Sequence, residues 1–164
     1  MVFKNSSGNT VMTNRVRNGF PIAIVPEDEY KEGYTFQGWM DEHTGVVYNN
    51  PNAIKEMAAW QNYAFSSVMQ LRKYNITYDK SGHGVIPSGI LTTYTIDDLP
   101  YVLPDLSNDG QWCFNGWIWE DGRIKNVITK EDLGDLTLTA DWHSVEMYTS
   151  TFNDGYSGAV VGTT

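Results

Sequence analysis

Residues 33–39 read Gly-Tyr-Thr-Phe-Gln-Gly-Trp, and residues 111–117 read Gln-Trp-Cys-Phe-Asn-Gly-Trp. Both stretches carry an aromatic residue, a Phe two positions later and a closing Gly-Trp pair, and they lie 78 residues apart. A pattern that returns at a fixed distance is the sequence signature of a repeated structural unit. We therefore predict that the chain contains two divergent copies of one unit of about 75 residues.

The beginnings and the ends of the two copies also correspond. Residues 65–69, Phe-Ser-Ser-Val-Met, resemble residues 138–142, Leu-Thr-Ala-Asp-Trp. Residues 74–79, Tyr-Asn-Ile-Thr-Tyr-Asp, parallel residues 148–153, Tyr-Thr-Ser-Thr-Phe-Asn, and more loosely residues 1–5. We therefore predict a first unit over residues 1–72, a second over residues 73–145, and a strand-like tail over residues 146–164 that resembles the start of a third copy.

Alternation of apolar and polar residues indicates that strands dominate both copies. Residues 136–142, Leu-Thr-Leu-Thr-Ala-Asp-Trp, alternate with the two-residue period of a strand. Helical signal is confined to residues 52–61 and to a short turn of helix at residues 129–133. In the first of these segments, the residues predicted to line one face are Ala53, Ile54, Met57, Ala58 and Trp60.

The repeated aromatic residues are predicted to form the core of each copy. Period two places Tyr34 and Phe36 on one face of a strand, whereas Trp39 falls on the other. A bulge at Gly38, and at Gly116 in the second copy, would turn all three aromatics to one side, because glycine accepts the positive φ that a bulge often needs. The fold-defining aromatics are Tyr34, Phe36, Trp39, Trp112, Phe114, Trp117 and Trp142.

The Phe-x-Gly-Trp strand followed by a Leu-Thr-Leu-x-Ala-x-Trp strand resembles the Listeria–Bacteroides repeat, also called the internalin B-repeat. Residues 111–117 and 136–142 carry the pattern in the second copy, and residues 33–39 carry its central motif in the first. The first copy departs at its end, where Met69 stands in place of the closing Trp. The resemblance implies small β-grasp-like units that serve as non-catalytic spacers or adhesion modules in bacterial surface proteins, with no cofactor.

The fold class that we predict is therefore mainly β with a minor helical part: two tandem small β-grasp-like repeat domains and a C-terminal strand-like tail. Within it, two residues are candidate contacts for a ligand or partner. Trp119 aligns with Asp41, and a position that accepts a carboxylate is expected to be exposed, so Trp119 could contact a glycan or a protein. The alternative is that Trp119 packs against a neighbouring strand or repeat. Tyr101, beside Pro100, is the second candidate.

Charge and composition argue against several classes of function. A net charge of −9 repels phosphate backbones and anionic lipid, and no run of 18 apolar residues exists, so we expect neither nucleic-acid binding nor membrane insertion. The histidines, His43, His83 and His143, lack the spacing of a metal pair and are expected to be exposed turn residues. Cys113 is the lone cysteine and is expected in the core. We therefore expect no enzyme, metal or cofactor; a hydrolase with two carboxylates between the copies is the distant alternative.

These observations predict a structural or adhesive module on the outside of a particle or cell. The start of the chain lacks the apolar stretch of a secretory signal, which fits either an excised piece of a surface protein or a bacteriophage virion component such as a capsid decoration or a head or tail fibre. Met1 just before a repeat start favours the virion component. Its partners would be copies of itself or a scaffold such as a capsid, joined through strand edges, with a host glycan as a further ligand. The alternative is a fragment of a bacterial cell-surface adhesin that acts as a spacer or as a carbohydrate- or protein-binding module.

Overall fold

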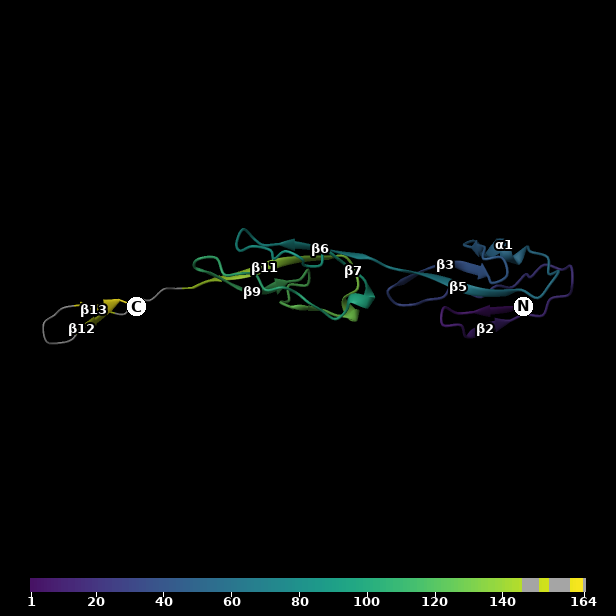
Figure 1. The fold of residues 1–164 in the computed structure, drawn as a ribbon, viewed down its shortest axis with the longest axis horizontal. Coiled ribbons are helices and arrows are strands. Elements are labelled where there is room, and N and C mark those ends of the chain that lie inside the picture. Colours follow the sequence, from purple (N-terminus) through teal and green to yellow (C-terminus); the bar gives the residue numbers. More distant parts are fainter. Residues whose placement is uncertain (146–150, 154–159, 164) are drawn as a thin grey trace. The chain divides into compact units, whose positions relative to one another are not determined.

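The computed structural model describes residues 1–145, 151–153 and 160–163 (Figure 1). Strands make up 39% of the chain and helices 8%, which confirms the predicted mainly-β fold. The chain divides into two compact units. The first comprises Met1–Tyr74 with Thr93–Leu99, and the second comprises Asn75–Thr92 with Pro100–Thr164.

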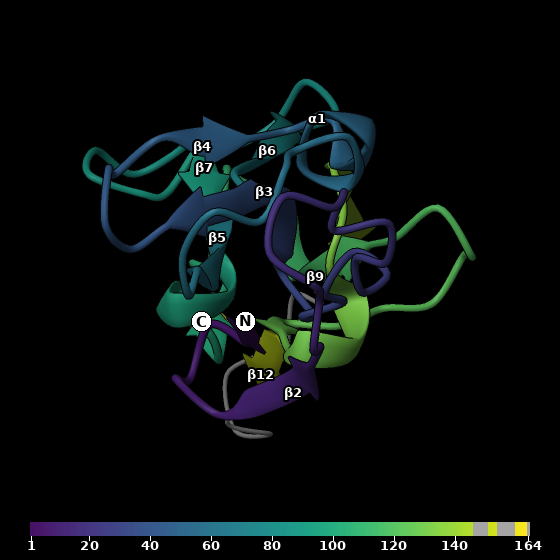
Figure 2. The same ribbon diagram turned by 90° about the vertical axis from the view of Figure 1, so that its right-hand side faces the viewer.

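The first unit is built on a five-stranded mixed sheet in the order β2-β1-β5-β3-β4. Its strands are β1 (Val2–Lys4), β2 (Thr10–Thr13), β3 (Tyr34–Asp41), β4 (Val47–Tyr48) and β5 (Ala64–Leu71). The first and last strands, β1 and β5, are parallel neighbours in the centre of the sheet, and the other pairs are antiparallel. Viewed end on, β4, β3 and β5 follow one another across the sheet (Figure 2). Central parallel pairing of the first and last strands is the arrangement of a β-grasp.

Aromatic rings fill the core of the first unit. Phe3 stacks on Phe65 with ring centroids 4.9 Å apart and meets the edge of Trp39 at 5.3 Å. Ile22 and Ile54 complete the buried cluster. Aromatic pairs of this geometry add to the stability that burial alone provides, so a small sheet obtains a core from few side chains.

The predicted helix over residues 52–61 is wrong in its length. Helix α1 spans only Pro51–Lys55, begins at the cap residue Asn50 and buries Ile54. Beyond it the backbone hydrogen-bonds to the loop that joins β2 to β3: Ile22 N donates to Met57 O at 3.0 Å, and Ala59 N donates to Phe20 O at 2.8 Å. The loop takes the hydrogen-bonding groups that a longer helix would use, and Trp60 is left 70% exposed instead of facing the core.

The chain after β5 forms a four-stranded sheet and a separate two-stranded one. From Asn75 on it belongs to the second unit, except for Thr93–Leu99. The larger sheet has the order β7-β6-β11-β9, with β6 parallel to β11 and β9 antiparallel to it. Its strands are β6 (Tyr74–Asp79), β7 (Thr93–Tyr94), β9 (Trp112–Ile118) and β11 (Leu136–Ser144), while β8 (Tyr101–Val102) pairs with β10 (Val127–Ile128). Two short 3₁₀ helices, η1 (Ile96–Asp98) and η2 (Lys130–Asp132), complete the elements. The second of these confirms the turn of helix predicted at residues 129–133.

Both sheets contain the predicted bulge at the glycine of the repeated motif. In β3 the register shifts between Phe36 and Gly38, and in β9 it shifts between Phe114 and Gly116. The two glycines have φ angles of +139° and +142°, a region that residues with a side chain rarely adopt. The bulge therefore occurs where the sequence predicts it.

The bulge brings the Phe and the Trp of each motif together. The rings of Phe36 and Trp39 lie 5.5 Å apart at 66°, and those of Phe114 and Trp117 lie 5.4 Å apart at 67°. Both tryptophans are buried. The pairing register also places Met69 opposite Phe36, as Trp142 lies opposite Phe114.

A hairpin lies within the predicted tail. Strands β12 (Thr151–Asn153) and β13 (Val160–Thr163) pair antiparallel, with Thr151 opposite Thr163 and Asn153 opposite Val160. The rest of the tail, residues 146–150, 154–159 and 164, lies outside the described residues.

Candidate binding site

The inference that led from Asp41 to an exposed Trp119 is wrong in its premise. Asp41 is only 2% exposed, because its carboxylate is satisfied inside the turn: it accepts from His43 N at 2.9 Å and from Thr44 Oγ1 at 3.0 Å. Trp119 itself is half-buried, donates from Nε1 to Lys125 O at 2.8 Å, and has the Lys125 ammonium 4.9 Å from its ring centroid. The indole is thus engaged by its own hairpin, and its role as a partner contact stays a prediction.

Tyr101, the second candidate, is also engaged within its unit. Its hydroxyl accepts from Leu91 N at 3.2 Å, and Tyr78 donates to the carbonyl of the same residue at 3.1 Å. Burial, and then the neighbouring Tyr101, raise the pKa of Tyr78. The two tyrosines therefore fasten one loop, and a contact role for Tyr101 also stays a prediction.

His83 is not the exposed turn histidine that the sequence predicts. Its ring stacks on Trp112 with centroids 4.6 Å apart and meets Trp142 edge-on at 5.8 Å. Trp142 in turn donates from Nε1 to Lys80 O at 2.9 Å. Trp112 and Trp142, two of the predicted fold-defining aromatics, thus hold the loop after β6. The sequence signal that could have indicated this is a His between two glycines, Gly82-His83-Gly84.

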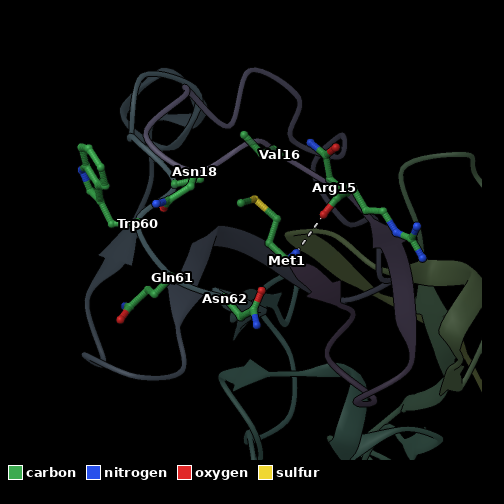
Figure 3. Close-up of a pocket in the computed structure, with 9 residues that line it drawn as sticks. Met1, Arg15, Val16, Asn18, Trp60, Gln61 and Asn62 are labelled. Carbon is green, nitrogen blue, oxygen red and sulfur yellow. Dashed lines mark hydrogen bonds between the residues drawn. The ribbon is translucent and has the colours of Figure 1, made fainter.

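The first unit contains a pair of adjoining cavities of about 320 and 340 Å³. They share a wall formed by residues 14–16, which follow β2. The first cavity, drawn in Figure 3, is lined on its other sides by Asn18 and by residues 59–62. The second is lined by residues 20–24 together with Arg17.

Backbone hydrogen bonds fix the frame of these cavities. Gly19 N donates to Ala59 O at 3.0 Å, and the bridge between Pro21 and Ala58 continues the pairing. From the shared wall, Asn14 Nδ2 donates to Ile22 O at 3.2 Å. The loop after β2 and the segment after α1 are therefore one braced surface.

Trp60 is the most prominent side chain of the first cavity. Its six-membered ring lies against Gly19, where an added Cβ would come within 3.1 Å of Cη2. Gly19 has a φ of +81°, so both its conformation and its lack of a side chain allow the indole to rest there. The indole of Trp60 thus packs against Gly19 on one side, while Trp60 as a whole is 70% exposed.

Polar side chains without protein partners line the same cavity as Trp60. Within the described part of the chain, Arg15, Asn18, Gln61 and Asn62 make no side-chain hydrogen bond or ion pair. In Figure 3, Asn18 lies between Trp60 and Met1, and the guanidinium of Arg15 extends to the side opposite Trp60. Donors and acceptors are therefore available to a bound molecule.

The charge of this region is opposite to that of the chain. Residues 1–26 contain Lys4, Arg15 and Arg17 and no Asp or Glu, whereas all 20 acidic residues follow position 26. Neither cavity is lined by a carboxylate. A site of this composition favours neutral or negatively charged ligands, and the acid-free start of the sequence is the signal that could have indicated it.

Among the described residues, no group of three or more His, Cys, Asp or Glu side chains is arranged to hold a metal ion. No helix in this part of the chain is long and apolar enough to span a bilayer.

Comparison with known proteins gives one match. Residues 2–59 match the family model of the Listeria-Bacteroides repeat domain, a family found in extracellular and surface proteins. No curated protein and no solved structure matches the chain. The match supports the resemblance for the first predicted copy, and the second copy remains a prediction that rests on the repeated motif. Over residues 2–59, therefore, the chain is similar to the Listeria-Bacteroides repeat domain.

Proposed function

We propose that the chain is a non-catalytic structural module of an externally displayed protein, a component of a phage virion such as a capsid decoration or a head or tail fibre, which assembles through a β-strand edge. The observation that carries the proposal is the β12–β13 hairpin. Residues 152–163, Phe-Asn-Asp-Gly-Tyr-Ser-Gly-Ala-Val-Val-Gly-Thr, resemble residues 3–13, Phe-Lys-Asn-Ser-Ser-Gly-Asn-Thr-Val-Met-Thr, which form the hairpin of β1 and β2.

The pairing of the two hairpins is similar as well. In the first hairpin Val2 lies opposite Thr13, and a register shift follows at Lys4; in the tail Thr151 lies opposite Thr163, and a shift follows before Asn153. The side of β1 that does not pair with β2 pairs with β5, in parallel. In the described part of the chain, β12 has β13 as its single neighbour. Its other side suits an added parallel strand, which a neighbouring subunit would supply.

The β2 edge of the first sheet is less suited to assembly. Strand β2 has four residues, and its register against β1 skips Val11 between Thr10 and Met12. Short edge strands and bulges discourage further pairing. Assembly is therefore assigned to the tail and not to the edge of the first sheet.

The environments of the carboxyl groups support a non-catalytic role. Burial raises the pKa of Glu29, but hydrogen bonds from Ser67 and Ser6 outweigh it, and the net pKa is lowered. Burial likewise raises the pKa of Asp132, and hydrogen bonds from Lys125 and Thr129 lower it further than burial raises it. A general acid needs a raised pKa, and these groups instead serve as hydrogen-bond acceptors in turns and caps.

The test is the mass of the whole chain in solution by light scattering at several concentrations, compared with a form that ends at residue 145. We expect a defined oligomer that is lost with the tail. Phe152→Pro, which removes a backbone N–H from β12, should have the same effect. Val11→Pro is the matched control at the β2 edge, because the bulged residue is one that tolerates proline. A monomer in both the long and the short form would exclude assembly through the tail.

A bacterial cell-surface adhesin is the second candidate, and the surface-protein family matched by residues 2–59 favours it. In that case the units act as a spacer or as a carbohydrate- or protein-binding module. Immunogold labelling with an antibody against the chain separates the two candidates, because the label lies on phage particles in one case and on the cell envelope in the other.

A further inference from the structure

We propose that the Trp60 cavity of the first unit binds an oligosaccharide that carries an acidic group, with one sugar ring stacked on the indole. This binding function goes beyond assembly through the tail and depends on different residues. It also moves the predicted glycan contact from Trp119 to Trp60.

The feature of Trp60 that favours binding is its exposure. All six tryptophans of the chain lie in the described part, and Trp60, at 70%, is the most exposed of them. Trp39 and Trp117, by contrast, form the cores of the sheets. A large apolar ring that is exposed and held in place is a feature of binding sites, since burying it on contact is favourable and little freedom is lost.

The indole of Trp60 rests on a braced backbone, and the two together form a platform. Gly19 backs the ring, and the hydrogen bond from Gly19 N to Ala59 O joins the backing directly to the residue before Trp60. The open face of the indole is therefore presented in a fixed position. A sugar ring has an apolar face of C–H groups, and such a face is complementary to a flat aromatic surface.

Amide side chains line the cavity beside Trp60. Asn18, Gln61 and Asn62 each offer an amide that both donates and accepts hydrogen bonds, and none is used by the described part of the chain. Sugar hydroxyls also donate and accept. The alternation of an apolar face and hydroxyl edges on a saccharide thus matches a cavity lined by an indole and by amides.

Two arginines supply positive charge to the cavities. Arg15 forms part of the wall shared by the two cavities, and Arg17 lines the second. The guanidinium of Arg15 points away from Trp60 (Figure 3), so it is placed for a neighbouring sugar and not for the one that stacks on the indole. A chain of two or three sugars with a carboxylate on the residue next to the stacked ring satisfies both features.

The experiment is an NMR titration of the whole, ¹⁵N-labelled chain with a sialylated trisaccharide and with the neutral disaccharide that lacks the acidic sugar. We expect shifts of the Trp60 indole N–H and of the Asn18 and Asn62 side-chain amides. Trp60→Ala should weaken binding of the acidic sugar at least about tenfold, the equivalent of about 1.4 kcal/mol. Arg15→Ala should reduce the preference for the acidic over the neutral sugar and the dependence of binding on salt.

Tyr30→Ala is the matched control, because Tyr30 is 88% exposed and lines neither cavity; it should bind as the unchanged chain does. Retention of the backbone spectrum by Trp60→Ala shows that its loss of binding is local. The proposal is overturned if neither sugar at millimolar concentration shifts the Trp60 resonance, or if Trp60→Ala and Tyr30→Ala bind alike. Equal binding of both sugars with a Trp60-dependent shift would overturn the acidic preference. Capture of a protein partner that depends on Trp60, with no response to sugars, would replace the saccharide.

Discussion

At the scale of single residues, two glycines determine how each motif strand packs. Gly38 and Gly116 have nearly the same positive φ, but the space around them differs. A Cβ at Gly38 would lie 2.4 Å from the carbonyl oxygen of Tyr48, whereas at Gly116 the nearest atom is a side-chain carbon of Ile124 at 2.5 Å. A backbone cannot move aside as easily as a side chain, so the first position is the stricter of the two.

We therefore predict that Gly38→Ala destabilises the first unit by about 1–3 kcal/mol more than Gly45→Ala does. Gly45 also has a positive φ, of +74°, but nothing lies within 4 Å of its added Cβ, so it reports the strain of a left-handed residue without a clash, about 1–2 kcal/mol. The excess at Gly38 combines its larger φ of +139° with the contact to Tyr48. Urea unfolding of both variants measures the difference. Equal costs would mean that the close approach of β4 to the bulge does not matter.

The two core tryptophans differ in one hydrogen bond. Trp117 Nε1 donates to Pro104 O at 2.8 Å, whereas Trp39 Nε1 is buried without an acceptor in the described part of the chain. Substitution by Phe removes similar volume at both sites. We predict that Trp39→Phe costs about 1–3 kcal/mol less than Trp117→Phe, because only the second leaves a carbonyl unpaired. Thermal or urea unfolding of the two variants measures the difference. A larger cost at Trp39 would contradict the stabilising role of the Trp117 hydrogen bond.

At the scale of elements, short helices are fixed by side-chain caps. In η2 the Thr129 hydroxyl and backbone N–H both donate to the carboxylate of Asp132, at 2.7 and 2.8 Å, and Lys125 adds an ion pair. Helix α1 uses Asn50 for the same purpose. A helix of three to five residues cannot form from propensity alone, so these caps determine where the chain turns.

We predict that Asp132→Ala destabilises the second unit by about 0.5–2 kcal/mol at neutral pH, the usual cost of a lost cap. The pKa of Asp132 is lowered on folding. Its contribution is therefore fully present above the unfolded value of about 3.9 and is lost as pH falls through the lower folded value. Unfolding curves of the two proteins should converge below about pH 4. The exposed Asp105→Ala serves as the control and should show no such convergence.

The sequence predicts elements well where the pattern is local and repeated. The bulge at Gly38 follows from the parity of three aromatics, and η2 follows from its cap residues. Helix α1 is predicted too long, because the hydrogen bonds that end it come from residues 19–23, about thirty positions earlier. The burial of Asp41 is missed for a related reason: a carboxylate satisfied by turn donors is indistinguishable in sequence from a solvated one. Trp60 follows α1, so its exposure could not be predicted without that loop.

At the scale of the whole molecule, each unit has apolar residues buried around its own tryptophan. Phe3, Ile54 and Phe65 surround Trp39, while Ile128 and Leu138 are buried in the unit that contains Trp117. We therefore expect each unit to unfold separately. The division into two copies after residue 72 stays a prediction that rests on the aromatic motif occurring twice.

We predict that Trp117→Ala, which removes a buried indole at a cost of about 3–5 kcal/mol, unfolds the second unit and leaves the first folded. In an NMR spectrum of the whole chain, the dispersed resonances of β9 and β11 should collapse while those of β3 and β5 stay in place. Loss of both sets would show that the units fold together. Trp60→Ala, at an exposed site, is the control and should leave both sets intact.

The closing strands of the two sheets carry different side chains opposite the Phe of the motif, Met69 in β5 and Trp142 in β11. Trp142 fits because Gly84 leaves room for it; a Cβ there would come within 2.7 Å of the indole. A nascent chain with two similar sheets risks pairing the strand of one with the partner of the other, a common failure of tandem repeats. Because each closing strand fits a differently shaped neighbour, a mismatched pair would be left with a clash or a void. We therefore expect the divergence at this position to disfavour pairing of a strand with the partner from the other sheet during folding.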